Sequence, residues 1–86
     1  MFYTYILKSK KNGRTYTGST SDLRKRLKQH NDGRSTFTKR DKPYELIYYE
    51  ACMNRNDAES RELSLKSGLG KRYLKNRLRG FLSQTG

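Results

Sequence analysis

Glu62 is the acidic residue that fits its surroundings least well. On a helical wheel of about 100° per residue, Glu62 falls close to Ala58 and Leu65, inside an apolar stripe. A carboxylate that points into a core must be paired, protonated or bound to a metal. Two interpretations stay open: a metal ligand, or a buried Arg–Glu pair that holds two helices together.

Arg26 and His30 stand out in the same way on an earlier helix. With Leu23 and Leu27 defining the buried stripe, His30 lies within it and Arg26 borders it. An arginine at the margin of a core typically holds a carboxylate or a phosphate. His30 is either a half-buried packing residue or a member of a site. The other basic residues of this helix fall on the solvent side, where they form a solvated face that can contact phosphate: Arg24, Lys25 and Lys28.

Tyr5 and Tyr16 lie on the two strands of an expected hairpin whose turn signal is Asn12-Gly13. A two-residue loop (12–13) or a four-residue loop (10–13) places both tyrosines on one face of the sheet, and a three-residue loop separates them. The alternative to a site is a pair of core tyrosines. Gly18 ends the second strand, where a backbone could approach a ligand closely or simply turn into a helix.

The elements that must position these residues follow from periodicity, caps and turns. Residues 3–8 are apolar on both alternating faces, which predicts a strand in the middle of a sheet. The other expected elements are a strand over 14–19, a helix capped at 20–22 and ending near 31, a polar loop over 34–43, a strand over 44–50, a helix over about 54–67, a break at 68–70 and a helix over about 71–82. We expect one α+β domain over residues 1–86. Its order is β-β-α-β-α-α, with a three-stranded antiparallel sheet, first strand central, flanked by three helices.

Composition indicates the class of partner. The 86 residues carry 20 Lys and Arg against 8 Asp and Glu, a net charge of +12, and seven Tyr supply much of the core. A domain so basic attracts polyanions, nucleic acid first and an anionic membrane second. The segment around the last helix is basic and contains no acid; its expected phosphate contacts are Lys71, Arg72, Lys75 and Arg79.

Other compartments and site types are disfavoured. No apolar run approaches the roughly 20 residues of a membrane span, and residues 1–7 lack the basic start of a signal peptide, so a cytoplasmic protein is expected. The single Cys and single His exclude an internal disulfide and a Cys/His zinc site within this chain.

Several short motifs together resemble the GIY-YIG endonuclease superfamily, in particular its small stand-alone bacterial branch. They are Tyr3-Thr4-Tyr5-Ile6-Leu7, Tyr16-Thr17-Gly18, Arg26-Leu27-Lys28-Gln29-His30-Asn31-Asp32-Gly33 and Arg61-Glu62-Leu63-Ser64-Leu65-Lys66. Tyr3, Thr4 and Thr17 replace the Gly, Ile and Ile of the two name-giving motifs. The resemblance covers about residues 2–80 and implies a three-stranded antiparallel sheet flanked by helices.

The resemblance also implies roles for individual residues. Tyr5 matches the tyrosine that ends the first motif, Tyr16 the tyrosine that opens the second, and Gly18 the glycine of the second. Arg26 matches the arginine of the first helix, and His30 a position one turn later that is His or Tyr in many members. Glu62 matches the single metal-binding glutamate.

The implied reaction is hydrolysis of DNA phosphodiester bonds by a water bound to Mg²⁺ or Mn²⁺, for which one carboxylate suffices. Arg26 would hold the scissile phosphate, Tyr5 is favoured as the base and Tyr16 as its positioning partner. His30 would assist proton transfer or contact phosphate. Because a free tyrosine has a pKa near 10, the base role requires neighbours that lower its pKa. We expect these four residues and Glu62 to line one concave patch.

DNA is the expected partner, with branched and single-stranded forms among the candidates, and the sequence indicates no membrane or partner protein. The alternative function is a non-catalytic basic module that binds nucleic acid and retains the fold. Glu62 discriminates between the two, since a carboxylate facing phosphate would only weaken a pure binder.

Overall fold

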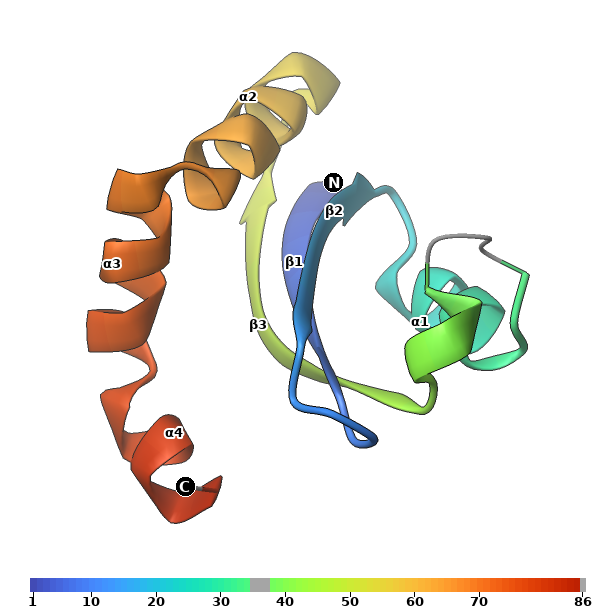
Figure 1. Cartoon of the computed structure of the whole chain (residues 1–86). Coiled ribbons are helices and arrows are strands. Elements are labelled where there is room, and N and C mark those ends of the chain that lie inside the picture. The colour runs from blue at the N-terminus through green and yellow to red at the C-terminus, as the bar shows by residue number, and fades with distance from the viewer. Residues whose placement is uncertain (35–37, 86) are drawn as a thin grey trace.

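Three antiparallel strands form the middle of the molecule in this computed structural model, which describes residues 1–34 and 38–85 (Figure 1). They are β1 (Phe2–Ser9), β2 (Thr15–Thr20) and β3 (Tyr44–Cys52), in the order β2-β1-β3. The expected α+β class, the antiparallel sheet and the central position of the first strand are therefore confirmed. Apolar side chains on both faces of β1 explain that position, because both faces are covered.

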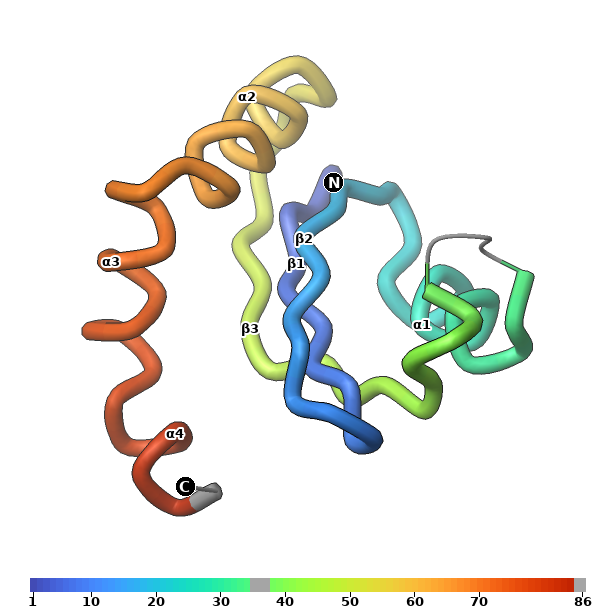
Figure 2. Tube along the Cα trace, viewed as in Figure 1, coloured from blue at the N-terminus to red at the C-terminus, as the bar shows by residue number. Residues whose placement is uncertain are grey.

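Helices cover the two faces of the sheet. On one side lie α1 (Leu23–Asn31) and the short 3₁₀ helix η1 (Lys39–Asp41); on the other lie α2 (Arg55–Lys66), α3 (Gly68–Arg77) and α4 (Arg79–Thr85) (Figure 2). Alternation along β1 divides its side chains between the two layers. Tyr5 and Leu7 face α1 and form the core with Tyr44, whereas the Thr4 hydroxyl donates a 2.8 Å hydrogen bond to the Ala58 carbonyl of α2.

The hairpin between β1 and β2 has a four-residue loop. Tyr5 pairs with Gly18 and Leu7 with Tyr16, and the Ser9 amide donates to the Arg14 carbonyl at 2.8 Å to close the loop. Gly13 takes the left-handed conformation (φ 78°) that the turn needs. Tyr5 and Tyr16 consequently lie on the same face, as diagonal neighbours.

The helix ends lie where the capping residues predict them. The Asp22 side chain accepts a hydrogen bond from the Lys25 amide and begins α1, and the Asn54 side chain caps α2. Ser67 ends α2 and also caps α3 by accepting from the Gly70 amide. The chain thus passes from α2 to α3 through one residue.

The C-terminal segment differs from the expectation in detail. The break falls at Ser67, so the glycines of 68–70 belong to α3, and the expected helix 71–82 is divided at Leu78 into α3 and α4. Gly70 allows the close crossing, because a side chain there would overlap the backbone of Ser64 and Leu65. Leu69 is 78% exposed, because α2 ends before it and it no longer follows the buried stripe of Ala58 and Leu65.

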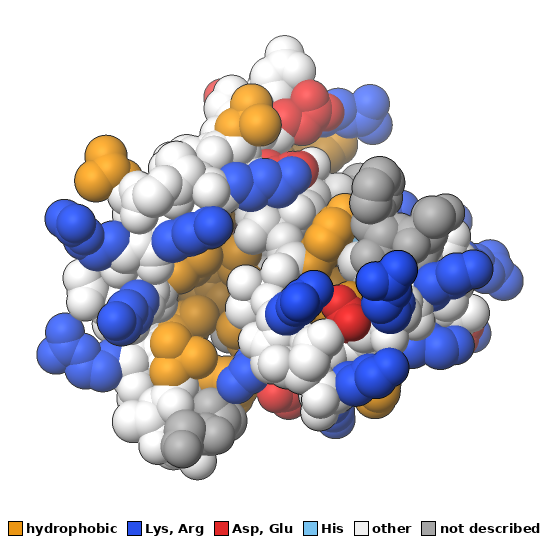
Figure 3. All heavy atoms as spheres, viewed as in Figure 1, with side chains coloured by type: hydrophobic (Ala, Val, Ile, Leu, Met, Phe, Trp, Pro, Cys, Tyr) orange, Lys and Arg blue, Asp and Glu red, His pale blue; other side chains and the backbone are white. Residues whose placement is uncertain are grey.

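Two further differences concern β3 and the loop before it. β3 continues to Cys52, two residues beyond the expected end, and the expected loop 34–43 contains η1, while its residues 35–37 lie outside the described part. Within residues 1–34 and 38–85, no helix is long and apolar enough to cross a membrane. A hollow of about 260 Å³ separates α3–α4 from the sheet, and apolar side chains show in it (Figure 3).

Candidate active site

Gly18 makes room for the Tyr5 ring. The two residues are paired across β1 and β2, and a Cβ on Gly18 would lie 2.5 Å from Tyr5 Oη. Only a glycine lets the ring cross β2 at this point. The close approach expected at Gly18 is therefore made by Tyr5 itself, and no ligand needs to contact this backbone.

Tyr5 Oη is the centre of a hydrogen-bond network that reaches α1. It lies 3.1 Å from His30 Nε2 and accepts a 3.4 Å hydrogen bond from Arg26 Nε. His30 Nδ1 lies 2.7 Å from Thr38 Oγ1. The side chains of Tyr5, His30 and Thr38 are almost completely buried, each at 1% exposure. The Arg26 side chain, by contrast, belongs to an exposed residue, so the network leads from the core to the surface.

Tyr16 completes this group by ring contacts. Its ring centroid lies 5.0 Å from that of His30 and 6.4 Å from that of Tyr5. We call Tyr5, Tyr16, Arg26, His30 and Thr38 the Tyr5 cluster. Tyr5 also belongs to the hydrophobic core, so the interpretation of Tyr5 as a core residue holds together with its place in the cluster.

The environment opposes charge on the buried members of the Tyr5 cluster. Burial raises the pKa of Tyr5, the Arg26 hydrogen bond acts in the opposite direction, and the charge of Glu62 adds to the increase. Burial, and then the Arg26 charge, lowers the pKa of His30. His30 is therefore neutral at neutral pH. A tyrosine that acts as a base needs a lowered pKa. Burial raises the pKa of Tyr5 instead, so it does not meet this requirement.

Glu62 lies on α2, the helix on the opposite face of the sheet, and acts on Tyr5 and Arg26 through its charge. Its partner is Lys66, whose Nζ lies 2.7 Å from Glu62 Oε2, and its side chain is 21% exposed. The alternative of a buried Arg–Glu pair is wrong for Glu62, whose partner is a lysine. The preceding residue, Arg61, makes a half-buried pair at 2.9 Å with Glu50 of β3. The negative charge of Glu62 still acts on Arg26, whose pKa is raised mainly by its hydrogen bond to Tyr5 and in part by Glu62.

Three of the residues expected in one concave patch are divided between two clefts, and the other two, Tyr5 and Glu62, line neither of these clefts. Arg26 and His30 line one of about 320 Å³ with Gln29 and Arg34. Tyr16 and Lys66 line the other, of about 310 Å³, in which Lys71 also takes part. The His30 ring, which lines the first cleft, lies 5.0 Å by its centroid from the Tyr16 ring, which lines the second. The sheet explains the division, because its edge strand β2 stands between the layers of α1 and α2.

The donor set suits a hard cation. Among residues 1–34 and 38–85, no three His, Cys, Asp or Glu side chains gather into a ready-made metal cage. Glu62 would therefore be the protein carboxylate, with water and substrate phosphate as the other ligands, as Mg²⁺ commonly binds. In this structure Glu62 Oε2 accepts a 2.7 Å hydrogen bond from Lys66 Nζ, which a metal ion at this oxygen would have to displace.

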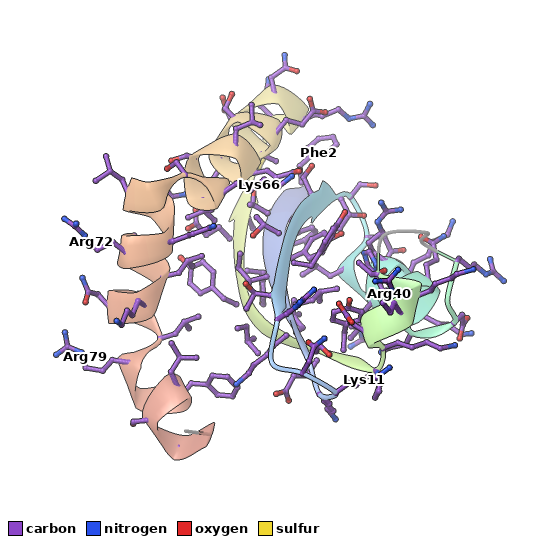
Figure 4. All side chains as sticks on the ribbon, in the orientation of Figure 1. Phe2, Lys11, Arg40, Lys66, Arg72 and Arg79 are labelled. Atoms are coloured by element: carbon purple, nitrogen blue, oxygen red, sulfur yellow. The ribbon has the colours of Figure 1, made fainter. Side chains whose placement is uncertain are left out.

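The basic residues expected to contact nucleic acid are all exposed, but they do not share one surface. Those of α1 are Arg24, Lys25 and Lys28, and those of α3 and α4 are Lys71, Arg72, Lys75 and Arg79. Lys28 is paired with Asp32 at 2.9 Å. Lys71 lines the Tyr16 cleft, whereas Arg72 and Arg79 point away from the sheet (Figure 4).

Two contacts of the site were not expected from the sequence. Thr38 lies in a polar loop, where nothing in the residue pattern marks it as the partner of His30. Lys66 follows Glu62 by one helical turn, and this spacing is the signal that could have identified the pair.

Comparison with known proteins agrees with the fold and with the motifs. The model of the GIY-YIG catalytic domain matches residues 1–79. A UPF0213 protein of Clostridium perfringens is 43% identical over 67 residues, covering 77% of this chain and 71% of the relative. One from Staphylococcus saprophyticus is 36% identical over 74 residues, covering 85% and 89%. The solution NMR structure of a UPF0213 protein from Bacillus halodurans superposes with a TM-score of 0.53 at 32% identity, covering 88% of this chain and 84% of that one. This chain therefore belongs to the GIY-YIG family, a superfamily of nucleases.

Proposed function

We propose that this protein is a metal-dependent endonuclease that hydrolyses phosphodiester bonds of DNA, structure-selective or weakly specific for sequence. The observation that carries the proposal is the convergence of Arg26 Nε and His30 Nε2 on Tyr5 Oη, within the field of Glu62. Membership of a family of catalytic domains and a net charge of +12 support nucleic acid as the substrate of these residues.

Arg26 is the phosphate-binding residue in this proposal. Its Nε donates a hydrogen bond to Tyr5 Oη, and its Nη1 donates a long 3.4 Å hydrogen bond to Gln29 Oε1. A phosphate oxygen forms shorter, charge-assisted hydrogen bonds with a guanidinium and would replace that contact. Bound so, the phosphate sits beside Tyr5, and the guanidinium stabilises the charge that develops in the transition state.

Tyr5 accepts the proton of the attacking water, and Tyr16, in ring contact with the same histidine, limits where that water can lie. Glu62 would hold the Mg²⁺ or Mn²⁺, which would supply positive charge to the phosphate and acidify a bound water. Lys66 is paired with Glu62 Oε2, so it must move away before a metal can bind this oxygen. Sequence-independent contacts with DNA come from three groups of basic side chains. They are Arg24, Lys25 and Lys28 of α1, Lys71 and Lys75 on the sheet side of α3, and the outer residues Arg72 and Arg79.

A nicking assay tests the proposal. Supercoiled plasmid, branched DNA and single-stranded DNA are incubated with the protein and Mg²⁺ or Mn²⁺, and Glu62→Gln is compared with Glu59→Gln. Glu59 is an exposed glutamate of the same helix, so it controls for the loss of one charge. Glu62→Gln should remain folded, bind DNA as well as or better than the parent, and lose cleavage. Glu59→Gln should cleave at the parental rate.

The competing function is a basic nucleic-acid-binding module without turnover, and the raised pKa of Tyr5 favours it, because a base must first lose its proton. DNA binding without cleavage under every metal condition would support this alternative. Cleavage by Glu62→Gln at the parental rate would instead exclude Glu62 as the metal ligand.

The arrangement as one domain over 1–86 and the cytoplasmic location stay predictions.

A further inference from the structure

A further cleft on the α1 side of the sheet is lined by two tyrosines. It measures about 430 Å³, more than either cleft at the candidate active site, and lies where β1, β3 and the start of α1 meet. Tyr3 and Tyr49 line it with ring centroids 5.9 Å apart. Leu23 and Leu46, which pack against the core, line it as well. A cleft of this volume is in the range of ligand pockets, and we call it the Tyr49 cleft.

Tyr49 is far more exposed than its neighbour in the sheet. It is paired across the strands with Tyr5, so both side chains lie on the same face, yet Tyr49 is 53% exposed and Tyr5 is 1% exposed. Within residues 1–34 and 38–85, the only aromatic ring in contact with Tyr49 is that of Tyr3, at an interplanar angle of 67°. The layer that buries Tyr5 therefore leaves the Tyr49 ring open to a ligand.

Two side chains of opposite charge also line the Tyr49 cleft. The Arg24 guanidinium has no hydrogen-bond or ion-pair partner in the described part of the chain. Asp22 caps α1 through Oδ1, which accepts a hydrogen bond from the Lys25 amide at 3.1 Å. A carboxylate repels phosphate, so the cleft does not suit a phosphate alone. A nucleotide suits both charges, because its base carries N–H donors for a carboxylate and its phosphate accepts from a guanidinium.

A base that enters the Tyr49 cleft must be unpaired. In a duplex each base is stacked on its neighbours and its pairing edge is occupied, whereas an unstacked base offers its π face to an aromatic side chain. The cleft lies close to the candidate active site, because Tyr49 and Tyr5 are partners on adjacent strands, which run about 5 Å apart. Arg24 and Arg26 are separated by about 200° on α1, so one DNA strand that crosses the start of this helix can contact both.

We infer that the Tyr49 cleft binds an unpaired nucleobase of the DNA substrate. The Tyr49 ring stacks on the face of the base, Asp22 accepts a hydrogen bond from its edge, and Arg24 holds the phosphate beside it. Because every base has a π face, the cleft accepts any sequence. This inference rests on the proposed function and specifies its substrate, which is DNA with unpaired nucleotides close to the scissile phosphate.

Binding without metal tests the inference apart from cleavage. A fluorescently labelled single-stranded oligonucleotide and the duplex of the same sequence are titrated with the protein in EDTA. Tyr49→Thr removes the ring and keeps a residue that favours strands. Its affinity for the single strand should fall roughly 5- to 150-fold, the range for one lost base stack, and its affinity for the duplex should stay that of the parent. Its salt slope should not change, because no phosphate contact is lost.

Two variants serve as controls for the loss of a tyrosine. Tyr49→Phe keeps the ring and should bind the single strand as the parent does. Tyr73→Ala removes a 41% exposed tyrosine from α3, on the other face of the sheet. It should leave the affinity for the single strand unchanged once only folded protein is counted. Thermal melting of each variant gives the folded fraction.

An abasic oligonucleotide of the same length tests the parent protein itself, so the inference remains decidable if Tyr49→Thr does not fold. It carries the same phosphates without bases, so the parent should bind it more weakly than the base-containing strand, and the difference should shrink in Tyr49→Thr. Equal affinity of the parent for the two oligonucleotides would overturn the inference. Parental affinity of Tyr49→Thr for the single strand, or an equal loss for single strand and duplex, would also overturn it.

Failure of the proposed function is distinguishable from failure of this inference. A parent protein that shows the expected differences in binding but cleaves no DNA with Mg²⁺ or Mn²⁺ would overturn the proposed function and support the base-binding cleft. A protein that cleaves DNA but binds the abasic and base-containing strands equally would overturn the cleft alone.

Discussion

Two clusters of tyrosines and charged groups lie on opposite faces of the same sheet, and they are built differently. The Tyr5 cluster lies against α1. The second cluster, which we call the Tyr48 cluster, lies against α2 and α3 and consists of Tyr48, Glu50, Arg61 and Tyr73. In it, Arg61 Nε and Nη2 each donate a 2.9 Å hydrogen bond to one oxygen of Glu50. The Tyr48 hydroxyl donates to the same carboxylate at 2.7 Å and lies 3.1 Å from the hydroxyl of Tyr73.

The difference lies in what remains open to a ligand. In the Tyr48 cluster both carboxylate oxygens are taken, and the Arg61 guanidinium also lies over the Tyr73 ring at 5.0 Å. In the Tyr5 cluster the buried side chains are neutral, and the charged groups lie at its border. There Arg26 makes a long hydrogen bond with Gln29, and Glu62 is paired with the half-exposed Lys66. A closed bidentate pair holds elements together, whereas a bordering charge with an exchangeable partner can bind a phosphate or a cation.

Arginine substitutions should give the largest contrast. Arg26→Ala should lower the cleavage rate by about 10²–10³-fold, because it removes a donor from the transition-state charge, with little change in melting. Arg61→Ala should leave the cleavage rate of the folded protein unchanged. It should lower the free energy of unfolding by about 2 kcal/mol, the range for hydrogen bonds to charged groups. Nicking rates corrected for the folded fraction, together with chemical denaturation, measure both. Equal loss of activity in the two variants would remove the distinction between the clusters.

Glycine substitutions should give the next largest effect. Gly18→Ala would place a Cβ 2.5 Å from Tyr5 Oη, so the ring must shift, at a cost of about 1–3 kcal/mol and with loss of cleavage. Gly80→Ala is the matched control, because no atom lies within 4 Å of a Cβ at that position of α4, and alanine is the better helix former. Thermal melting and nicking of both variants test this. A stable and active Gly18→Ala protein would show that Tyr5 does not need its place beside β2.

Acid should weaken the two clusters in different pH windows. The pKa of His30 is lowered from 6.5 by burial, so below about pH 6.5 the unfolded state takes up a proton first and stability falls as the pH falls. The pKa of Glu50 is lowered from 4.5, mainly by the Arg61 hydrogen bond; the stability from that pair is present above pH 4.5 and is lost as the pH falls through the folded-state value. Denaturation curves between pH 7.5 and 3.5 should show both steps. His30→Gln should remove the first step and Glu50→Gln the second; a first step that persists in His30→Gln would refute the assignment.

Salt dependence should give the smallest effect of a single residue. Neutralising one phosphate contact lowers the slope of log Kobs against log salt by about one unit. Lys71→Gln should do so, because Lys71 lines the Tyr16 cleft. Arg72→Gln and Arg79→Gln should change the slope less, since these side chains point away from the sheet (Figure 4). Slopes that fall equally in all three variants would instead favour DNA bound along the outer side of α3 and α4.

Much of this arrangement was predictable from local patterns, and the remainder depends on contacts between layers. Helical periodicity located Arg26 and His30 beside the stripe of Leu23 and Leu27, which do pack against the core. The turn signal left hairpin loops of two, three and four residues open, and the chain adopts the four-residue loop, one of the two that place Tyr5 and Tyr16 on the same face. Periodicity identified Glu62 as unusual but not its partner, because an acid beside a buried stripe can turn toward Lys66 at the helix margin.

Other features had no local signal at all. Thr38 contacts His30 across eight positions of the chain, and no residue pattern marks the two as partners. The last helix is divided at Leu78, and no glycine or proline at that position predicts the division. The two clefts in place of one follow from the edge strand β2, whose position is a property of the assembled sheet.

Removing one hydroxyl from each cluster separates catalysis from stability most directly. Tyr5→Phe and Tyr48→Phe are compared for nicking rate per folded molecule and for the free energy of unfolding. Tyr5→Phe should lose at least about 10²-fold in cleavage, the scale of general base catalysis. Tyr48→Phe should cleave at the parental rate and lose about 1 kcal/mol of stability, the value of a typical hydrogen bond. A Tyr5→Phe protein that cleaves as fast as the parent would contradict the central claim that the Tyr5 cluster performs the reaction.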